Sequence, residues 1–222
     1  SEIDPGREVM NRWIRRVYEV VKKGGSDQEL MIRIRGDMDW CFTAGLDVKT
    51  WIRDGIVDVI IPESTAQQVD TNADLRPFVE AAKGTDCRIL ASLTSHMDSD
   101  RLNEGTIETI RAEACNYWQQ GIDGLYVNQW FSRWPYQGSF YEILREVPHP
   151  DIMAPKDKIY HVPTETGRHP TERLQPDLVP RLPVDLLEGK CASAELMVSD
   201  DLPRWDRVGR VHEVILRIRV IE

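Results

Sequence analysis

The chain has 222 residues, of which 41% are hydrophobic and 29% are charged. This composition predicts a folded protein of one or two domains and excludes collagen-like, mucin-like and disordered chains. No stretch approaches the roughly 18 apolar residues that a membrane-spanning helix needs. The 28 basic and 37 acidic residues give a formal net charge of −9, which argues against nucleic acid and anionic membranes as partners.

The four cysteines are spread along the chain and form no CxxC pair. They indicate neither a disulfide framework nor a zinc site. No GxSxG motif marks a nucleophilic serine, and we predict no cofactor and no metal ion. Because a leader peptide could precede Ser1, the sequence leaves the cellular compartment open.

Helices and strands are expected to alternate through the first 147 residues. Asp4-Pro5 supplies a helix start, and apolar residues then recur at three- and four-residue spacing up to Val21. Short runs rich in Ile and Val follow the helices, as buried strands do. The expected helices span residues 5–23, 47–54, 73–83, 106–120 and 140–146, and the expected strands span 30–35, 57–61, 87–91 and 123–127.

Glycines at positions 25, 55, 84 and 121 end four of these helices, which gives repeats of 30, 29 and 37 residues. Helix alternating with strand at this period predicts an α/β fold with a parallel sheet. An eight-stranded α/β barrel uses about 31 residues per unit. The four units therefore match half of such a barrel.

Two features favour the second half of a (β/α)8 TIM barrel over a small doubly wound sheet. The sequence opens with a helix that no strand precedes, and neither GxGxxG nor GxxxxGK[ST] follows any strand. We therefore expect residues 1–147 to form barrel strands five to eight. A missing N-terminal half is the expected structural partner.

The composition changes at Pro148, because nine of the 13 prolines lie between Pro148 and Pro203. Residues 148–190 are therefore interpreted as a proline-rich linker. Partial alternation over 192–198 and 211–220 predicts strands, so residues 191–222 are expected to begin a β-sandwich-like domain. Two or three strands cannot close a sandwich, which suggests that this domain is truncated.

Catalytic groups of α/β barrels lie at the carboxyl ends of strands. Glu63 ends an apolar strand directly after Pro62, which predicts a partly buried carboxylate suited to general acid catalysis. The alternative is a structural carboxylate paired with Arg33 or Arg35. Asp37 follows the preceding strand and is the second catalytic candidate, because glycoside hydrolysis uses two carboxylates. Its alternative role is a turn or a helix cap.

Other polar residues at the strand ends are candidates for substrate binding. Arg35 is expected to face the barrel interior, where it binds an acidic sugar, orients a catalytic carboxylate or forms a structural ion pair. Asp39, His96 and Asp98 add hydrogen-bonding groups. Since no second histidine is clustered with His96, a sugar subsite is favoured there over a metal site.

Aromatic residues gather in the same predicted loops. Trp40, Trp130 and Trp134 follow strands, next to Asn128 and Gln129. Flat aromatic faces stack on the CH face of a sugar, while amides bind its hydroxyl groups. This combination predicts a carbohydrate substrate, and the alternative is that the tryptophans plug the mouth of the barrel.

Two runs carry a resemblance to a known family. Residues 45–62 (GLDVKTWIRDGIVDVIIP) and 121–128 (GIDGLYVN) resemble the later barrel strands of glycosyl hydrolase-like family 10 proteins. The resemblance covers residues 7–147 and implies a bacterial TIM-barrel protein, with appended β domains, that hydrolyses O-glycosidic bonds without a cofactor. In barrels that carry carboxylates after strands four and six, Glu63 would take the second place, and its partner would lie in the missing half.

The sequence thus predicts a glycoside hydrolase-like protein that cleaves an oligo- or polysaccharide. Glu63 is the expected acid/base, and its partner is Asp37 or an upstream carboxylate. The first alternative is a non-catalytic carbohydrate-binding or cell-surface module on a degenerate barrel. The second is a metal-dependent enzyme centred on His96.

Overall fold

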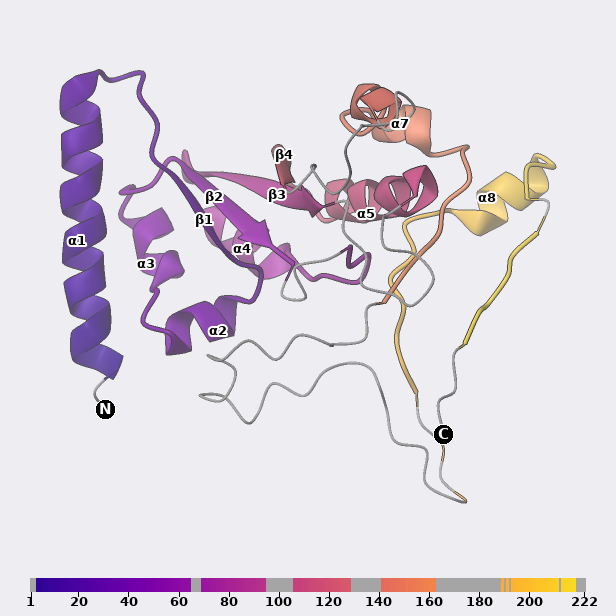
Figure 1. Cartoon of the computed structure of the whole chain (residues 1–222), viewed down its shortest axis with the longest axis horizontal. Coiled ribbons are helices and arrows are strands. Elements are labelled where there is room, and N and C mark those ends of the chain that lie inside the picture. Colours follow the sequence, from indigo (N-terminus) through magenta and orange to yellow (C-terminus); the bar gives the residue numbers. More distant parts are fainter. Residues whose placement is uncertain are drawn as a thin grey trace.

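The computed structural model describes residues 3–64, 69–94, 106–128, 141–162, 189, 191, 193–211 and 213–218, and the statements below concern these residues. Helices and strands alternate from residue 3 to residue 128 (Figure 1). The helices are α1 (Ile3–Gly24), α2 (Met38–Thr43), α3 (Val48–Arg53), α4 (Arg76–Ala82), α5 (Ile107–Gln119), α7 (Pro150–Met153) and α8 (Leu202–Arg207), with a 3-10 helix η1 (Ile143–Arg145). The strands are β1 (Met31–Arg35), β2 (Val59–Glu63), β3 (Arg88–Thr94) and β4 (Gly124–Asn128).

The four strands form one parallel sheet in the order β1-β2-β3-β4. This confirms the α/β fold and the parallel sheet that the repeat length predicts. Each strand pairs with the strand that follows it in the sequence, without a reversal of order. Because crossovers between parallel strands are right-handed, a sequential order places the connecting helices on one face of the sheet.

Local sequence signals set the helix boundaries. The side chain of Asp47 accepts a hydrogen bond from the Thr50 amide at the start of α3, and Thr106 caps α5 in the same way. The chain reverses after α3, α4 and α5 at glycines 55, 84 and 121, whose φ angles are 61°, 74° and 88°. These left-handed conformations favour glycine. The three glycines that predict the helix ends in the sequence therefore also terminate the helices in the structure.

The apolar core lies between the helices and one face of the sheet. Ile34, Ile60, Ile89 and Leu93 supply the strand side of this core. Helix residues complete it: Trp51 and Ile52 from α3, Phe78 from α4, and Ile110 and Ala114 from α5. Arg33, Ile61, Ser92 and Asn128 belong to the opposite face by strand register. Of the predicted functional residues, Arg35, Glu63 and Asn128 lie on that face.

Three short helices were not predicted. Helix α2 follows β1 directly, while α7 and α8 lie in the regions expected to be linker and β domain. The expected helix at 140–146 is represented by η1. Residues 193–200 and 213–218 contain no strand, because no described segment pairs with them. The β-sandwich-like domain therefore stays a prediction.

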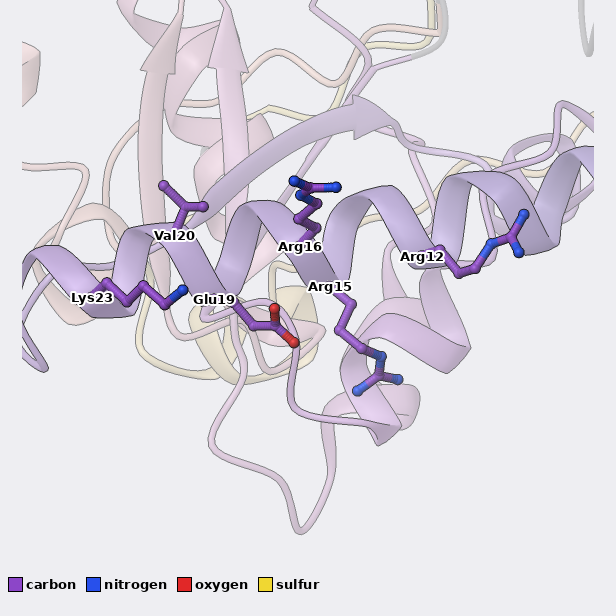
Figure 2. A pocket seen from close by; sticks show the side chains of 6 residues that line it. All are labelled: Arg12, Arg15, Arg16, Glu19, Val20 and Lys23. Atoms are coloured by element: carbon purple, nitrogen blue, oxygen red, sulfur yellow. The ribbon is translucent and has the colours of Figure 1, made fainter.

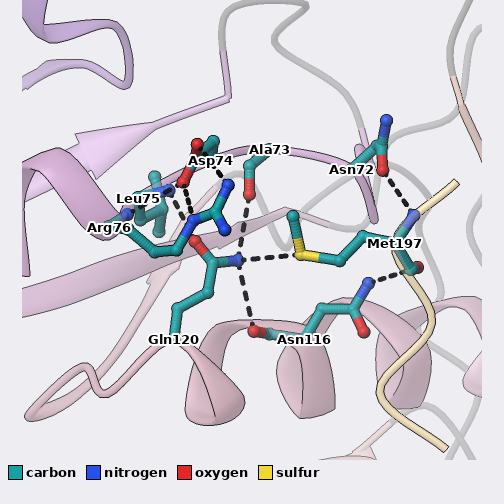
Figure 3. Close-up of polar contacts among 8 residues, drawn as sticks. All are labelled: Asn72, Ala73, Asp74, Leu75, Arg76, Asn116, Gln120 and Met197. Atoms are coloured by element: carbon teal, nitrogen blue, oxygen red, sulfur yellow. Dashed lines mark hydrogen bonds and ion pairs between the residues drawn. The ribbon is translucent and has the colours of Figure 1, made fainter. Parts of the chain in front are cut away.

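Residues 195–197 lie against the α/β unit, and Figure 3 shows Met197 beside Asn72 and Asn116. Asn72 binds the carbonyl of Glu195 at 2.9 Å and accepts from the Met197 amide at 2.6 Å. Asn116 donates to the Met197 carbonyl at 2.9 Å. Two amide side chains thus satisfy the backbone of a segment about 80 to 125 residues away in the sequence.

No helix in the described ranges is long and apolar enough to cross a membrane.

Candidate functional site

The middle of β1 and the carboxyl ends of β2 and β4 bring three polar side chains together. Asn128 donates from Nδ2 to Glu63 Oε1 at 2.5 Å, and its Oδ1 accepts from Arg33 Nη1 at 2.9 Å. Arg33 Nε lies 3.4 Å from Glu63 Oε2. Both functional atoms of the Asn128 amide and both oxygens of the Glu63 carboxylate are thereby engaged. We call these three residues the strand-end cluster.

Exposure differs among the members of the strand-end cluster. Asn128 is buried, the Glu63 side chain is 19% exposed and the Arg33 side chain is 49% exposed. The carboxylate is thus reachable from solvent at its edge and held from the protein side by an amide and a guanidinium. Glu63 thus forms the ion pair with Arg33 that the sequence left as the alternative to a catalytic role. Glu63 also lies at the end of a strand, where a catalytic carboxylate is expected.

The strand-end cluster indicates that the sheet is curved. β1 and β4 are separated by two strands, so their axes would lie about 14 Å apart in a flat sheet. Side chains on a flat sheet stand roughly perpendicular to it, and Arg33 and Asn128 would then not meet. Their contact at 2.9 Å requires the face that carries them to be concave.

Gly36 lets the backbone at the end of β1 lie close to the end of β2. The Gly36 amide donates to the Glu63 carbonyl at 2.6 Å. A Cβ atom at Gly36 would lie 2.6 Å from the same carbonyl oxygen, which real side chains do not tolerate. Gly36 therefore allows the backbone after β1 to lie against the end of β2 and fixes the position of Glu63.

Asp37 acts as the N-cap of α2. Its Oδ1 accepts a hydrogen bond from the Trp40 amide at 2.8 Å. This is the capping role that the sequence left as the alternative, and one carboxylate oxygen is committed to it. Asp39 lies in the first turn of the same helix with its side chain exposed.

Arg35 and Trp40 lie against each other. The Arg35 guanidinium carbon is 5.0 Å from the centroid of the Trp40 ring, a cation–π contact. Both residues are partly buried next to the end of β1. The structure therefore joins two of the predicted sugar-binding residues, and it places them beside Asp37 in the sequence segment that follows the strand.

The remaining predicted site residues, His96, Asp98, Gln129, Trp130 and Trp134, lie outside the described residues.

Two further polar side chains line the same face. Ser92 and Thr94 lie on β3 and are 1% and 2% exposed. Continuing the β2–β3 register places Ser92 level with Glu63. The Ser92 hydroxyl is buried without a hydrogen-bond partner in the described part of the chain. Such an unsatisfied group next to a carboxylate can bind a hydroxyl group or a water molecule.

Glu113, in the middle of α5, is a buried carboxylate that was not predicted from the sequence. It is fully buried, and its Oε1 accepts from the Asp70 amide and from the Tyr117 hydroxyl, both at 3.2 Å. Burial raises the pKa of Glu113 to about 8, against the lowering effect of these two hydrogen bonds. Its helical position, one turn before Tyr117, carried no signal that distinguishes it from a surface glutamate.

The buried thiols are poor nucleophiles. Burial raises the pKa of Cys41 to about 12 and the pKa values of Cys87 and Cys115 to about 11. Thiols with such pKa values are protonated at neutral pH.

The chain matches no protein-family model, and no curated protein sequence matches it.

Proposed function

We propose that this chain is the second half of a glycoside hydrolase-like α/β barrel and that Glu63 is the acid/base of its O-glycosidic bond cleavage. The observation that carries the proposal is the strand-end cluster. It combines a strand-terminal carboxylate with amide and guanidinium groups on the concave face of a sequentially ordered parallel sheet. Reacting groups of α/β barrels occupy this position.

The curvature supports a barrel over a doubly wound sheet. A doubly wound sheet needs a reversal of strand order and covers both faces with helices. Here the order is sequential, and side chains of the first and fourth strands meet over one face. Four more units would close the ring, and the partner carboxylate would come from them.

An upstream carboxylate fits the role of partner better than Asp37. The Asp37 carboxylate already binds the N-terminus of α2, while Glu63 ends β2 on the same face as Arg33 and Asn128. In this mechanism Glu63 protonates the leaving oxygen of the glycosidic bond. Asn128 and Arg33 hold its carboxyl group in place, and Trp40 and Arg35 form one wall for a sugar ring.

The Glu63→Gln substitution in the protein with its complete barrel tests the proposal. Glutamine can still accept the Asn128 hydrogen bond but cannot transfer a proton, so turnover should fall about 100-fold to 10,000-fold. Screening oligo- and polysaccharides with a reducing-end product assay provides the readout, and a glycan array reports binding. Glu142→Gln is the matched control, because it makes the same substitution at an exposed glutamate outside the strand-end cluster. Unchanged turnover in Glu63→Gln would remove Glu63 from the chemistry.

A non-catalytic carbohydrate-binding module is the second candidate. It is favoured by the ion pair of Glu63 with Arg33, since a purely structural carboxylate would show the same pairing. This candidate predicts glycan binding without product release, in both the original protein and Glu63→Gln.

A further inference from the structure

The outward face of α1 carries an unusual set of exposed apolar side chains. Ile14 is buried against the core, whereas Val9, Trp13 and Val20 are 56%, 58% and 61% exposed. Helical spacing places these three residues on one side of the outer face. Figure 1 shows α1 at one end of the molecule, beyond α3. Exposed apolar side chains grouped on one side of a helix are typical of interaction surfaces.

Charged residues run along the same face beside the apolar ones. A shallow hollow is lined by Arg12, Arg15, Arg16, Glu19, Val20 and Lys23 (Figure 2). Arg15 is bound to Asp54 at 2.7 Å. Within the described ranges, no hydrogen bond or ion pair joins the side chains of Arg12, Arg16, Glu19 and Lys23 to another residue. These groups are available to a partner.

Two pairs of oppositely charged residues are placed symmetrically about the middle of α1. Glu8 and Lys23 are equally far from the midpoint between residues 15 and 16, and so are Arg12 and Glu19. A two-fold axis through this midpoint would set Glu8 and Glu19 opposite Lys23 and Arg12 of the other copy. Self-complementarity of this kind is the requirement of an isologous interface.

We propose that α1 binds α1 of a second copy of this chain in antiparallel orientation, with Arg12 opposite Glu19 and Glu8 opposite Lys23. A two-fold axis perpendicular to the helix pair keeps the charged sides of the two helices together and the apolar sides together. The charges therefore form two symmetric sets of ion pairs along one edge of the interface.

The apolar edge is self-complementary as well. In this alignment Val9 lies about 3 Å along the axis from Val20 of the second copy, close enough for contact. Trp13 has the same offset from Arg16 of the second copy. The Arg16 guanidinium of one copy can thus stack on the Trp13 indole ring of the other. This stacking keeps the two Arg16 side chains, which lie near the two-fold axis, apart.

The charge balance favours a second copy over an anionic membrane. α1 contains six basic residues and three acidic residues, a net charge of +3, whereas the whole chain carries −9. An anionic bilayer would attract the basic residues of the helix but offers no basic group to Glu8 and Glu19. A second copy places Lys23 and Arg12 opposite these two carboxylates and adds the matching apolar edge.

Sedimentation velocity over about 1 µM to 1 mM tests the proposal. One helix per copy is a small interface, so we expect a monomer–dimer equilibrium with a Kd on the order of 10–100 µM. Arg12→Glu should weaken it about tenfold by opposing two glutamates. The Arg12→Glu/Glu19→Arg double variant exchanges the charges and should restore dimerisation to within about threefold.

Lys49→Glu is the matched control, because it makes the same change of charge at an exposed position of α3 and should leave the Kd unchanged. Three results would overturn the proposal. These are a monomer at every concentration, equal weakening by Arg12→Glu and Lys49→Glu, or a double variant no better than Arg12→Glu. Co-sedimentation of a monomeric chain with phosphatidylserine vesicles would assign the surface to a membrane instead.

Discussion

Two glutamates of this protein show how position decides what a carboxylate can do. Glu63 ends β2, is 19% exposed and faces the Arg33 guanidinium and the Asn128 amide. Glu113 lies inside α5, is fully buried and accepts hydrogen bonds only from neutral donors among the described residues. The first has a cation and access to solvent, and the second has neither.

The comparison separates a shifted pKa from a functional position. Carboxylates with strongly raised pKa values are common in active sites, and on that criterion Glu113 would be chosen. Its contacts serve the architecture instead, because they join α5 to the segment that precedes α4. Glu63 is selected by geometry, since it lies at a strand end on a concave face with donors around it. Our proposal therefore rests on position in the fold and not on a shifted pKa.

The largest expected effect is the change in stability caused by Glu113→Gln. The pKa is near 4.5 in the unfolded chain and about 8 in the folded one, so the unfolded state releases the proton first. Stability should therefore fall as the pH rises from 4.5 to 8. Glu113→Gln removes this dependence and should gain on the order of a few kcal/mol over the original protein at pH 8.5, with little difference at pH 4.5.

Urea unfolding at a series of pH values measures this difference. Glu142→Gln, at an exposed position, is the control and should follow the original protein throughout. If Glu113→Gln and the original protein lose stability in parallel between pH 4.5 and 8, then Glu113 is ionised in the folded state, and its contrast with Glu63 disappears.

A smaller effect is expected at Asp37, the third carboxylate in question. Asp37→Ala removes the cap of α2 and should lower the free energy of unfolding by about 1 kcal/mol, measured by urea unfolding. Asp39→Ala in the same turn should change it by less than about 0.5 kcal/mol. Glycan cleavage by the complete barrel should survive Asp37→Ala. Loss of turnover with intact folding would make Asp37 the catalytic partner of Glu63.

The α/β alternation could be predicted because its signals are local. Each glycine that ends a helix, and each Ile- and Val-rich strand after it, is visible within a few residues. The six-residue helix α2 was missed, although Asp37 was recognised as a possible cap, because so short a helix has no measurable apolar period.

The contacts of the strand-end cluster depend on residues far apart in the sequence. Arg33 was considered as a partner of Glu63, and Asn128 was predicted to bind hydroxyl groups. Their mutual hydrogen bond spans 95 residues and follows from the curvature of the sheet, which no local pattern encodes. The hydrogen bonds from Asn72 and Asn116 to the backbone of residues 195–197 likewise depend on the tertiary fold.

A double-mutant cycle between Arg33 and Asn128 tests the central claim most directly, because it asks whether the first and fourth strands share a concave face. The free energy of unfolding is measured for Arg33→Met, Asn128→Ala and the double variant. We predict a coupling energy of about 1 kcal/mol, as expected for side chains in contact. Additivity within about 0.3 kcal/mol would mean that the two side chains do not meet, and the curved sheet and its strand-end cluster would have to be abandoned.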